Sequence, residues 1–124
     1  MRVVPSLVSV VDDDESVRES LPDLLRAFGF AVEAYSSAGD FLASGSLDRT
    51  DCLILDIAMP GMTGPQLQDE LKARGAAIPI VFITAQADPN LRQRMCRRGA
   101  AECLFKPFSP PDLIDAVNAA LRPG

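Results

Sequence analysis

The fold is decided by the stretch Cys52-Leu53-Ile54-Leu55-Asp56, which passes from four apolar residues directly to an acid. An almost wholly apolar run of this length is typical of a strand buried on both faces of a parallel sheet. Turn-forming residues dominate the following positions 59–64, and Pro65 suits the first position of a helix. The sequence therefore predicts a buried strand that ends at Asp56, followed by a loop and a helix.

The same alternation extends in both directions along the chain. Further β-rich segments occupy 7–11, 31–35, 78–83 and 102–105. Helical patterns begin near five positions: Ser16, with Glu19 as a capping box, Ser37, Pro65, Asp88 with Pro89, and Ser109. Five strands alternating with five helices predict an α/β fold with a parallel sheet and helices on both faces. Because no repeat or low-complexity linker interrupts the pattern, we expect residues 1–124 to form a single domain.

Polar residues stand at the ends of four predicted strands. Asp12 and Asp13 follow the first strand, and Asp56 ends the third. Thr84 and Lys106 follow the fourth and the fifth. Because the carboxyl ends of parallel strands meet at one edge, these side chains are expected to share a crevice. Clustered carboxylates repel one another, and a hard, oxygen-rich pocket favours Mg²⁺. A carboxylate beside Mg²⁺ and a lysine is suited to phosphoryl transfer.

Taken singly, each of these residues has an ordinary structural explanation. The acidic residues 12–14 could be a solvated loop that caps the first helix, and Thr84 could be present simply as a β-former. Lys106, before a proline, is more often a surface charge. Their coincidence at four different strand ends favours a functional site over four separate accidents.

Composition excludes several functions. The net charge of −5 disfavours direct nucleic acid binding by this domain, and we expect no membrane association because no apolar run reaches membrane-spanning length. The absence of histidine excludes histidine-based triads, histidine zinc sites and a phosphohistidine in this chain. The cysteines Cys52, Cys96 and Cys103 show no CxxC spacing, so each is expected to pack as a small apolar residue in a reducing cytoplasm.

Four motifs, in this order and spacing, make the chain resemble the receiver domains of two-component response regulators. They are VVDDD at 10–14, LDIAMPGMTG at 55–64, ITA at 83–85 and KPF at 106–108. The overall sequence is similar to that of regulators of the nitrogen-fixation type, which carry a helix-turn-helix output domain. The resemblance implies a doubly wound, flavodoxin-like sheet of five parallel strands in the order 2-1-3-4-5. It also implies a signalling switch in the cytoplasm that is phosphorylated by a sensor histidine kinase, rather than an enzyme acting on a separate substrate.

The resemblance also implies roles for the residues at the strand ends. Asp56 matches the phosphoacceptor of the family. Asp13 matches the direct ligand of Mg²⁺, Asp12 the acid that holds metal-bound water, and the backbone carbonyl of Ala58 a further ligand. These matches imply a metal site made of Asp12, Asp13, Asp56 and Ala58.

Two further roles complete the implied machinery for phosphoryl transfer. Thr84 matches the switch hydroxyl that binds the phosphoryl group, and Lys106 matches the lysine that pairs with Asp56 or its phosphoryl oxygens. With Asp56, these residues form the catalytic set. Pro107 matches the family's cis proline.

The chain departs from its relatives at two positions. Cys103 stands where most relatives carry Tyr or Phe, whose ring turns inward as the threonine moves, and Phe105 lies two residues further on. Ala58 stands where relatives often carry a longer polar or basic side chain, so it offers no hydrogen bond to an attacking water.

Three other functions compete with this interpretation. An aspartate-nucleophile phosphatase typically carries Asp-x-Asp, and Asp56-Ile57-Ala58 lacks the second acid. A degenerate receiver that signals by protein contacts without phosphate is opposed by the complete set of polar residues at the strand ends, whereas Cys103, in place of the usual aromatic residue, is consistent with it. A nucleotide-binding module is poorly supported because no glycine-rich loop follows the first strand.

Charge patterning suggests how the signal could leave the domain. The segment 91–98 contains four arginines, and the last helix contains Asp112 and Asp115. Opposite charges on neighbouring helices could pair across a two-fold axis, which predicts a homodimer through this face and the adjoining strand at 102–105. The alternative is a solvated arginine-rich helix that contacts nothing.

Overall fold

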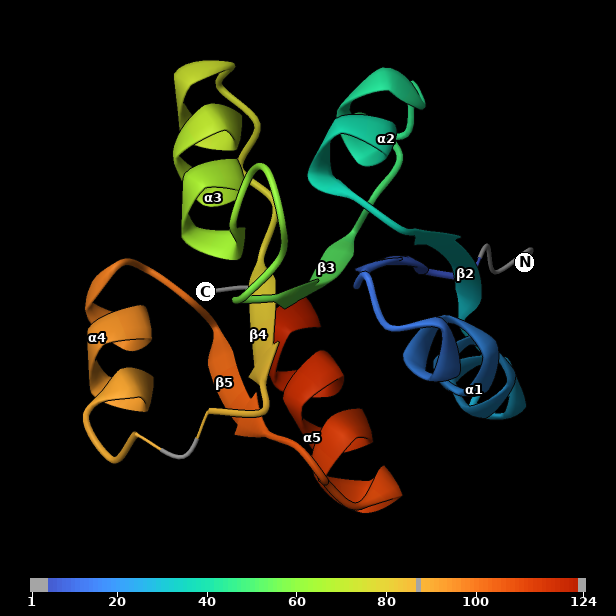
Figure 1. Ribbon diagram of the computed structural model, residues 1–124. Coiled ribbons are helices and arrows are strands. Elements are labelled where there is room, and N and C mark those ends of the chain that lie inside the picture. The colour runs from blue at the N-terminus through green and yellow to red at the C-terminus, as the bar shows by residue number, and fades with distance from the viewer. Residues whose placement is uncertain (1–4, 87, 123–124) are drawn as a thin grey trace.

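The computed structural model describes residues 5–86 and 88–122, and strands and helices alternate along them (Figure 1). The strands are β1 (Leu7–Val11), β2 (Ala31–Tyr35), β3 (Cys52–Asp56), β4 (Ile80–Thr84) and β5 (Glu102–Phe105). The helices are α1 (Glu15–Ala27), α2 (Ala38–Ala43), α3 (Gly64–Ala73), α4 (Leu91–Arg97) and α5 (Pro110–Leu121).

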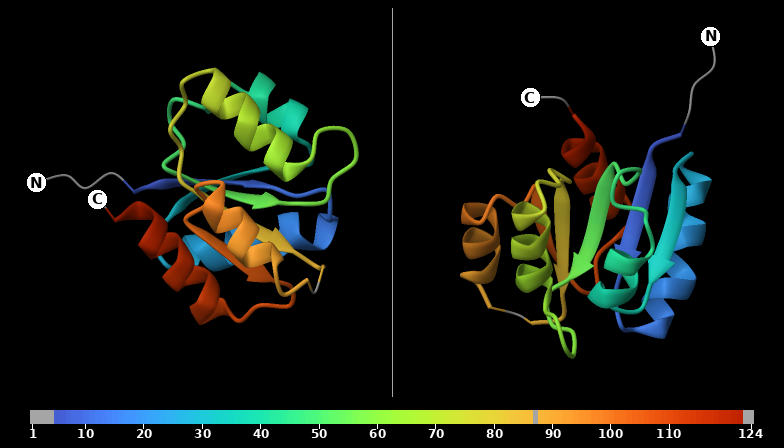
Figure 2. Two further views of the ribbon diagram at one scale, coloured as in Figure 1. Left: turned by 90° about the vertical axis from the view of Figure 1, so that its left-hand side faces the viewer. Right: turned by 90° about the horizontal axis from the view of Figure 1, so that it is seen from above.

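The strands form one sheet in the order β2-β1-β3-β4-β5, and every neighbouring pair is parallel. The order 2-1-3-4-5 is thereby confirmed. Helices α1 and α5 cover one face of the sheet, while α2, α3 and α4 cover the other (Figures 1 and 2). Strand order reverses beside β1 and β3, which places their carboxyl ends at the topological switch point of the sheet.

The alternation of side chains along β3 divides the core into two clusters. Ile54 packs with the residues beneath α1 and α5, while Leu53 and Leu55 pack with those beneath α2, α3 and α4. All five residues of β3 are buried, as the apolar sequence predicts. Fully burying one such aliphatic side chain stabilises the fold by about 2 kcal/mol. Within the described residues, no helix is long and apolar enough to cross a membrane.

Helix α1 begins differently from the sequence prediction. Its N-cap is Asp14, whose carboxylate accepts a hydrogen bond from the backbone N–H of Ser16 at 2.9 Å. The capping box expected from Ser16 and Glu19 is therefore wrong. Aspartate and serine are about equally good N-caps, so sequence preference alone does not decide between adjacent candidates.

Helix α4 also begins later than expected, at Leu91 rather than at Pro89. A turn precedes it, in which Asp88 accepts hydrogen bonds from the backbone N–H groups of Asn90, at 2.9 Å, and Leu91, at 3.1 Å. Asn90 occupies the N-cap position but makes no side-chain capping bond. The first turn of α4 is therefore less firmly anchored than that of α1.

The fourth strand is also displaced slightly from its expected position. It covers 80–84 rather than 78–83, so Thr84 is its last residue. Helix α3 begins at Gly64, one residue before the expected Pro65, because Thr63 and Gln66 form a capping box.

Candidate functional site

Asp12 lies immediately beyond β1 and is fully buried. Its Oδ1 accepts a hydrogen bond from the backbone N–H of Asp14 at 2.9 Å, and its own N–H donates to the carbonyl of Tyr35 at 3.1 Å. From α1, Arg18 donates to the Asp12 carbonyl at 3.0 Å. These bonds hold Asp12 firmly, whereas the neighbouring Asp13 is exposed.

Asp56 is the last residue of β3 and is 6% exposed. Its Oδ1 accepts a hydrogen bond from the backbone N–H of Ala58 at 3.3 Å, which brings the exposed Ala58 to the site. Gly64 approaches the same strand from α3, because a Cβ added there would lie 2.5 Å from the carbonyl oxygen of Asp56. Only glycine therefore allows α3 to begin this close to Asp56.

The structure brings the sequence-predicted charged residues together. One carboxylate oxygen from each of Asp12, Asp13 and Asp56 lies within 4.8 Å of the other two. The Lys106 Nζ donates to Asp12 Oδ2 at 2.9 Å and lies 4.0 Å from Asp56 Oδ2. Three acids thus face one ammonium group at the carboxyl edge of the sheet.

Burial and repulsion dominate the electrostatics of this cluster. Burial, together with the negative charge of Asp12, raises the pKa of Asp56 to about 7, although Lys106 acts in the opposite direction. Burial lowers the pKa of Lys106, but the hydrogen bond and the charge of Asp12 outweigh it and leave that pKa raised. The lysine therefore remains a cation at neutral pH, while Asp56 is only partly ionised without a further positive charge.

Thr84 lies on the strand beside Asp56 and is fully buried. Its Oγ1 accepts a hydrogen bond from the backbone N–H of Gln86 at 3.1 Å, and its carbonyl accepts one from the N–H of Lys106 at 2.7 Å. The hydroxyl is thus tied to the first residues of the β4–α4 loop, and the backbone links Thr84 directly to Lys106.

The chemistry of the donors suits a hard divalent cation. Three carboxylates supply oxygen ligands, which Mg²⁺ prefers, and the raised pKa of Asp56 reflects negative charge that one lysine does not balance. A divalent ion here would relieve that repulsion and leave the Asp56 carboxylate ionised.

The cysteines divide into two groups. Cys52 and Cys103 are fully buried, and burial raises the thiol pKa to about 12 for Cys52 and about 11 for Cys103. Cys96 is exposed on α4, so its expected burial is wrong. The neighbouring Met95 occupies the buried face of that helix, which turns Cys96 outward.

Cys103 lies in the core beneath α4, where the relatives' aromatic ring would be expected. Phe105 packs against the same cluster of residues and is half-buried. An aromatic ring is therefore present on this face of β5, two residues further along the strand.

Sequence reasoning missed two residues of the site. Arg18 reaches Asp12 from the first turns of α1, a contact that depends on how the helix is rotated against β1. Gly64 was included only as part of a turn-rich loop. The signal that could have found it is a glycine immediately before the helical Pro65, where a turn alone does not require one.

Comparisons with known proteins agree with this fold and arrangement of residues. The family model for the response regulator receiver domain matches residues 8–118. The chain therefore belongs to the receiver domain family of response regulators, the signalling proteins of two-component systems.

Two curated relatives and one solved structure illustrate the relationship. Nodulation protein W of Bradyrhizobium diazoefficiens is 44% identical over 115 residues, which cover 93% of this chain and 51% of the relative. Transcriptional regulatory protein FixJ of Azorhizobium caulinodans is 44% identical over 115 residues, covering 92% of this chain and 54% of the relative. The crystal structure of FixJ-N superimposes with a TM-score of 0.84 at 33% identity, covering 96% of this chain and 95% of that one. The chain spans about half the length of the curated relatives it matches.

Proposed function

We propose that Asp56 accepts a phosphoryl group from a sensor histidine kinase, and that the resulting charge changes the surface formed by α4 and β5. The observation that supports this most directly is the position of Asp56, buried at a strand end, grouped with Asp12 and Asp13, and 4.0 Å from Lys106. A buried carboxylate beside a fixed ammonium group is equipped to act as a nucleophile toward phosphorus.

In the transfer, a carboxylate oxygen of Asp56 forms a bond to phosphorus as the phosphorus–nitrogen bond of the kinase phosphohistidine breaks. The histidine leaves with the bonding electron pair and is protonated. Lys106 balances the negative charge that accumulates on the phosphoryl oxygens. The backbone N–H of Ala58, bonded to Asp56 Oδ1, helps to hold the carboxylate in place during the reaction.

The cofactor in this proposal is Mg²⁺, which Asp12, Asp13, Asp56 and the backbone carbonyl of Ala58 would hold. It would supply positive charge to offset the negative charge of the reacting groups. Asp12 is already fixed by hydrogen bonds, so it contributes position as well as charge. Asp13 is free to turn toward an ion because it is exposed.

The decisive experiment is to incubate the protein with Mg²⁺ and phosphoramidate and to measure its intact mass. We expect one phosphoryl group on the parent and none on Asp56→Asn. Asp14→Asn is the matched control, because asparagine caps a helix as well as aspartate does and Asp14 lies outside the carboxylate cluster. Equal labelling of Asp56→Asn and the parent would refute the proposal. Turnover of phosphate esters with no stable adduct would favour the phosphatase alternative.

A groove beside the site offers a docking place for the kinase. It has a volume of about 460 Å³, and one wall is the Val17–Leu24 side of α1. Lys106, Pro107 and Phe108 form the other wall. Because Lys106 belongs to both the groove and the acidic site, a helix seated there would present its phosphohistidine to Asp56. Val17→Asp should then slow transfer from the kinase while phosphoramidate still labels Asp56, and equal loss from both donors would count against docking here.

Thr84 connects phosphorylation with the output surface in this proposal. Its hydroxyl turns to donate to a phosphoryl oxygen and gives up the backbone N–H of Gln86. The β4–α4 loop then changes position. Cys103 cannot reproduce the ring movement of the relatives, so the signal reaches α4 through this backbone connection.

A homodimer through α4, β5 and α5 is the assembly that this change would favour. Arg94 is paired with Asp88 at 2.9 Å, and Arg98 with Asp69 at 2.8 Å, whereas Arg97 makes no ion pair within the described residues. Arg97 is therefore the most available partner for an acid on α5 of a second copy.

The remaining parts of the proposal concern the domain as a unit and its output. Residues 1–124 act as a single receiver domain in the cytoplasm, without direct binding of nucleic acid or membrane. The relatives' names describe a nodulation protein and a transcriptional regulator, which supports control of transcription as the output.

A further inference from the structure

The two ends of α4 are attached to the rest of the domain in different ways. At the C-terminal end, Arg98 donates to Gln68 Oε1 at 3.1 Å, to the Pro65 carbonyl at 3.0 Å and to Asp69 Oδ1 at 2.8 Å. Gln68 in turn donates to the Arg98 carbonyl at 3.0 Å, as does Lys72 at 2.9 Å. Gln68 is only 3% exposed, so its two bonds with Arg98 are partly shielded from water, whereas the bonds of Asp69 and Lys72 are exposed. The last turn of α4 is therefore fastened to α3.

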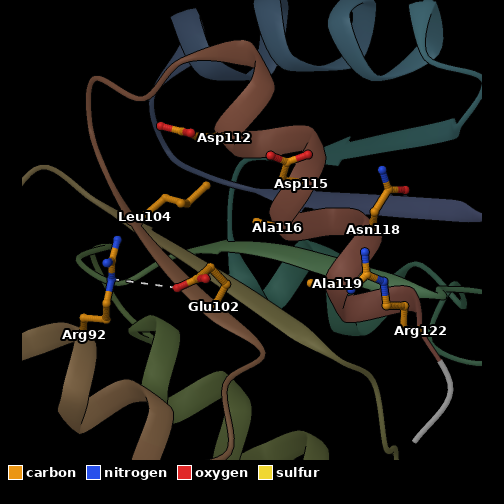
Figure 3. A pocket seen from close by; sticks show the side chains of 9 residues that line it. All are labelled: Arg92, Glu102, Leu104, Asp112, Asp115, Ala116, Asn118, Ala119 and Arg122. Carbon is orange, nitrogen blue, oxygen red and sulfur yellow. Dashed lines mark ion pairs between the residues drawn. The ribbon is translucent and has the colours of Figure 1, made fainter.

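The N-terminal end of α4 has a weaker attachment. Leu91 packs in the core, but the N-cap makes no side-chain hydrogen bond, and the first turn makes its polar contact with β5 through Arg92. The Arg92 Nε donates to the Cys103 carbonyl at 3.0 Å and lies 3.8 Å from Glu102 Oε1 (Figure 3). Its guanidinium also lies 5.6 Å from the ring centre of Phe105. The Arg92 side chain is 53% exposed, so water competes for each of these contacts.

These contacts cover an edge of the sheet. β5 is the last strand in the sheet, so every second residue of β5 directs its backbone N–H and C=O away from β4, toward the open edge. Lys106 directs its N–H toward β4, where it donates to the Thr84 carbonyl, so Cys103 directs its backbone groups toward the open edge. The Cys103 N–H donates to Glu102 Oε1 at 3.0 Å. Its carbonyl accepts from Arg92. The ion pair of Arg92 and Glu102 thus occupies both polar groups of the Cys103 backbone.

The same pair stands beside a hollow between α4 and α5. Figure 3 shows Arg92 extending from α4 toward Glu102, with Asp112 and Asp115 on α5 across the strand. The hollow has a volume of about 510 Å³ and contains Arg92 and Glu102 in its lining. Movement of Arg92 would therefore alter both the strand edge and the shape of the proposed output surface.

We propose that Arg92 is a releasable latch and Arg98 a fixed hinge, so that phosphorylation frees the first turn of α4 while its last turn stays on α3. The inference rests on the proposed phosphorylation of Asp56 and names the residues through which it acts. When Thr84 releases the Gln86 N–H, the loop leading to α4 shifts and draws Arg92 away from β5. Glu102 and the Cys103 backbone then become accessible, whereas the bonds between Arg98 and Gln68 persist.

Residue-resolved amide hydrogen exchange by NMR on the whole chain tests both halves. Two amides report on the first turn: Cys103 N–H, whose acceptor Glu102 is paired with Arg92, and Arg94 N–H, which donates to the Asn90 carbonyl at 3.0 Å. Phosphorylation by phosphoramidate, verified by intact mass, should free Glu102 and loosen this turn, and so speed exchange at both amides by about fivefold, the effect of losing one ordinary hydrogen bond. Exchange at Arg98 and Gly99 should not change. Equal acceleration at both ends of α4, or none at Cys103, would overturn the inference.

Variants separate this inference from the proposed function. Arg92→Gln should speed Cys103 exchange in the unphosphorylated protein, and Arg97→Gln on the same helix should not. Gln68→Ala should speed exchange at the C-terminal end of α4 instead. If phosphoramidate adds no mass, the proposed function fails, but the Arg92→Gln comparison still decides whether the latch exists. If mass is added and Cys103 exchange is unaffected in both experiments, the latch is refuted and the phosphoacceptor stands.

Discussion

The ammonium group of Lys106 is bonded to Asp12, at 2.9 Å, across 94 positions of the sequence. Asp12 is fully buried and the Lys106 side chain is 20% exposed. The contribution of this ion pair to stability should therefore lie between those of fully exposed and fully buried pairs. The pair joins the first strand to the last across the switch point of the sheet.

Replacing Lys106 by Met should lower the free energy of unfolding by about 2 kcal/mol at neutral pH, because it leaves the buried Asp12 without its cation. Urea denaturation in the presence of a chelator measures the change. Because the folded pKa of Lys106 is raised, its stabilisation is present at neutral pH and disappears only in alkaline solution. Lys106→Arg is the control that retains the charge, and a loss as large as that of the methionine variant would show that shape, rather than charge, matters here.

Without metal, stability should depend on pH through Asp56. Its folded pKa is raised from 3.8 to about 7, so the folded state binds this proton more tightly than the unfolded state does. The contribution of Asp56 is therefore most favourable below about pH 4 and is lost as pH rises toward 7, with a slope of about 1 kcal/mol per pH unit.

Melting curves of the parent and Asp56→Asn in chelator, between pH 5 and pH 8, measure this contribution as a difference. The window avoids Glu33, which acts in the opposite direction: although burial raises its pKa, hydrogen bonds from Ser46 and Arg49 outweigh burial and lower it, so its stabilisation is lost only in more acidic solution. Parallel pH profiles for parent and variant would show that Asp56 titrates normally.

Mg²⁺ should stabilise the native protein, because an ion that binds only the folded state adds free energy by mass action. At a hundredfold excess over Kd, the increase should be about 3 kcal/mol. Asp13→Asn should abolish most of this response and, without metal, should stabilise the protein by relieving repulsion. Asp14→Asn should respond like the parent. A melting temperature that is unchanged by millimolar Mg²⁺ would exclude the metal site.

Thr84→Ala should uncouple phosphorylation from assembly. The variant should still accept a phosphoryl group on Asp56 but remain monomeric, because no hydroxyl draws the β4–α4 loop toward the site. Analytical ultracentrifugation of phosphorylated parent, Thr84→Ala and Thr84→Ser follows the effect, and the serine variant should dimerise. Arg97→Glu should weaken the dimer without affecting labelling. A phosphorylated parent that stays monomeric at high concentration would remove the dimer from the proposal.

Much of the site could be predicted because parallel strands bring their carboxyl ends together. That rule places Asp12, Asp56 and Lys106 close together at one edge of the sheet regardless of loop conformation, and the structure does so. The buried strand β3 was equally predictable, since an apolar run ending in an acid is difficult to accommodate elsewhere.

Helix ends and helix rotations were less predictable. Asp14 and Ser16 are both good N-caps, and the choice depends on the path of the chain beyond β1. The bond between Arg98 and Gln68 joins residues 30 positions apart and depends on how α3 and α4 are rotated toward each other. The sequence contains both residues but no pattern that relates them.

Because Gly64 approaches Asp56 so closely, substitutions on the two sides of this loop should have different effects: one position affects the chemistry at Asp56, and the other affects folding. The backbone is fixed at both ends of the intervening segment, by the buried strand on one side and by the start of α3 on the other. Ala58 lies between these two fixed ends, exposed and hydrogen-bonded to Asp56. A longer side chain at position 58 could reach a water molecule approaching Asp56 without moving β3 or the start of α3. If Asp56 accepts phosphate as proposed, a substitution at Ala58 should change the lifetime of the phosphorylated state without unfolding the domain, whereas any residue larger than glycine at position 64 would clash with the Asp56 backbone.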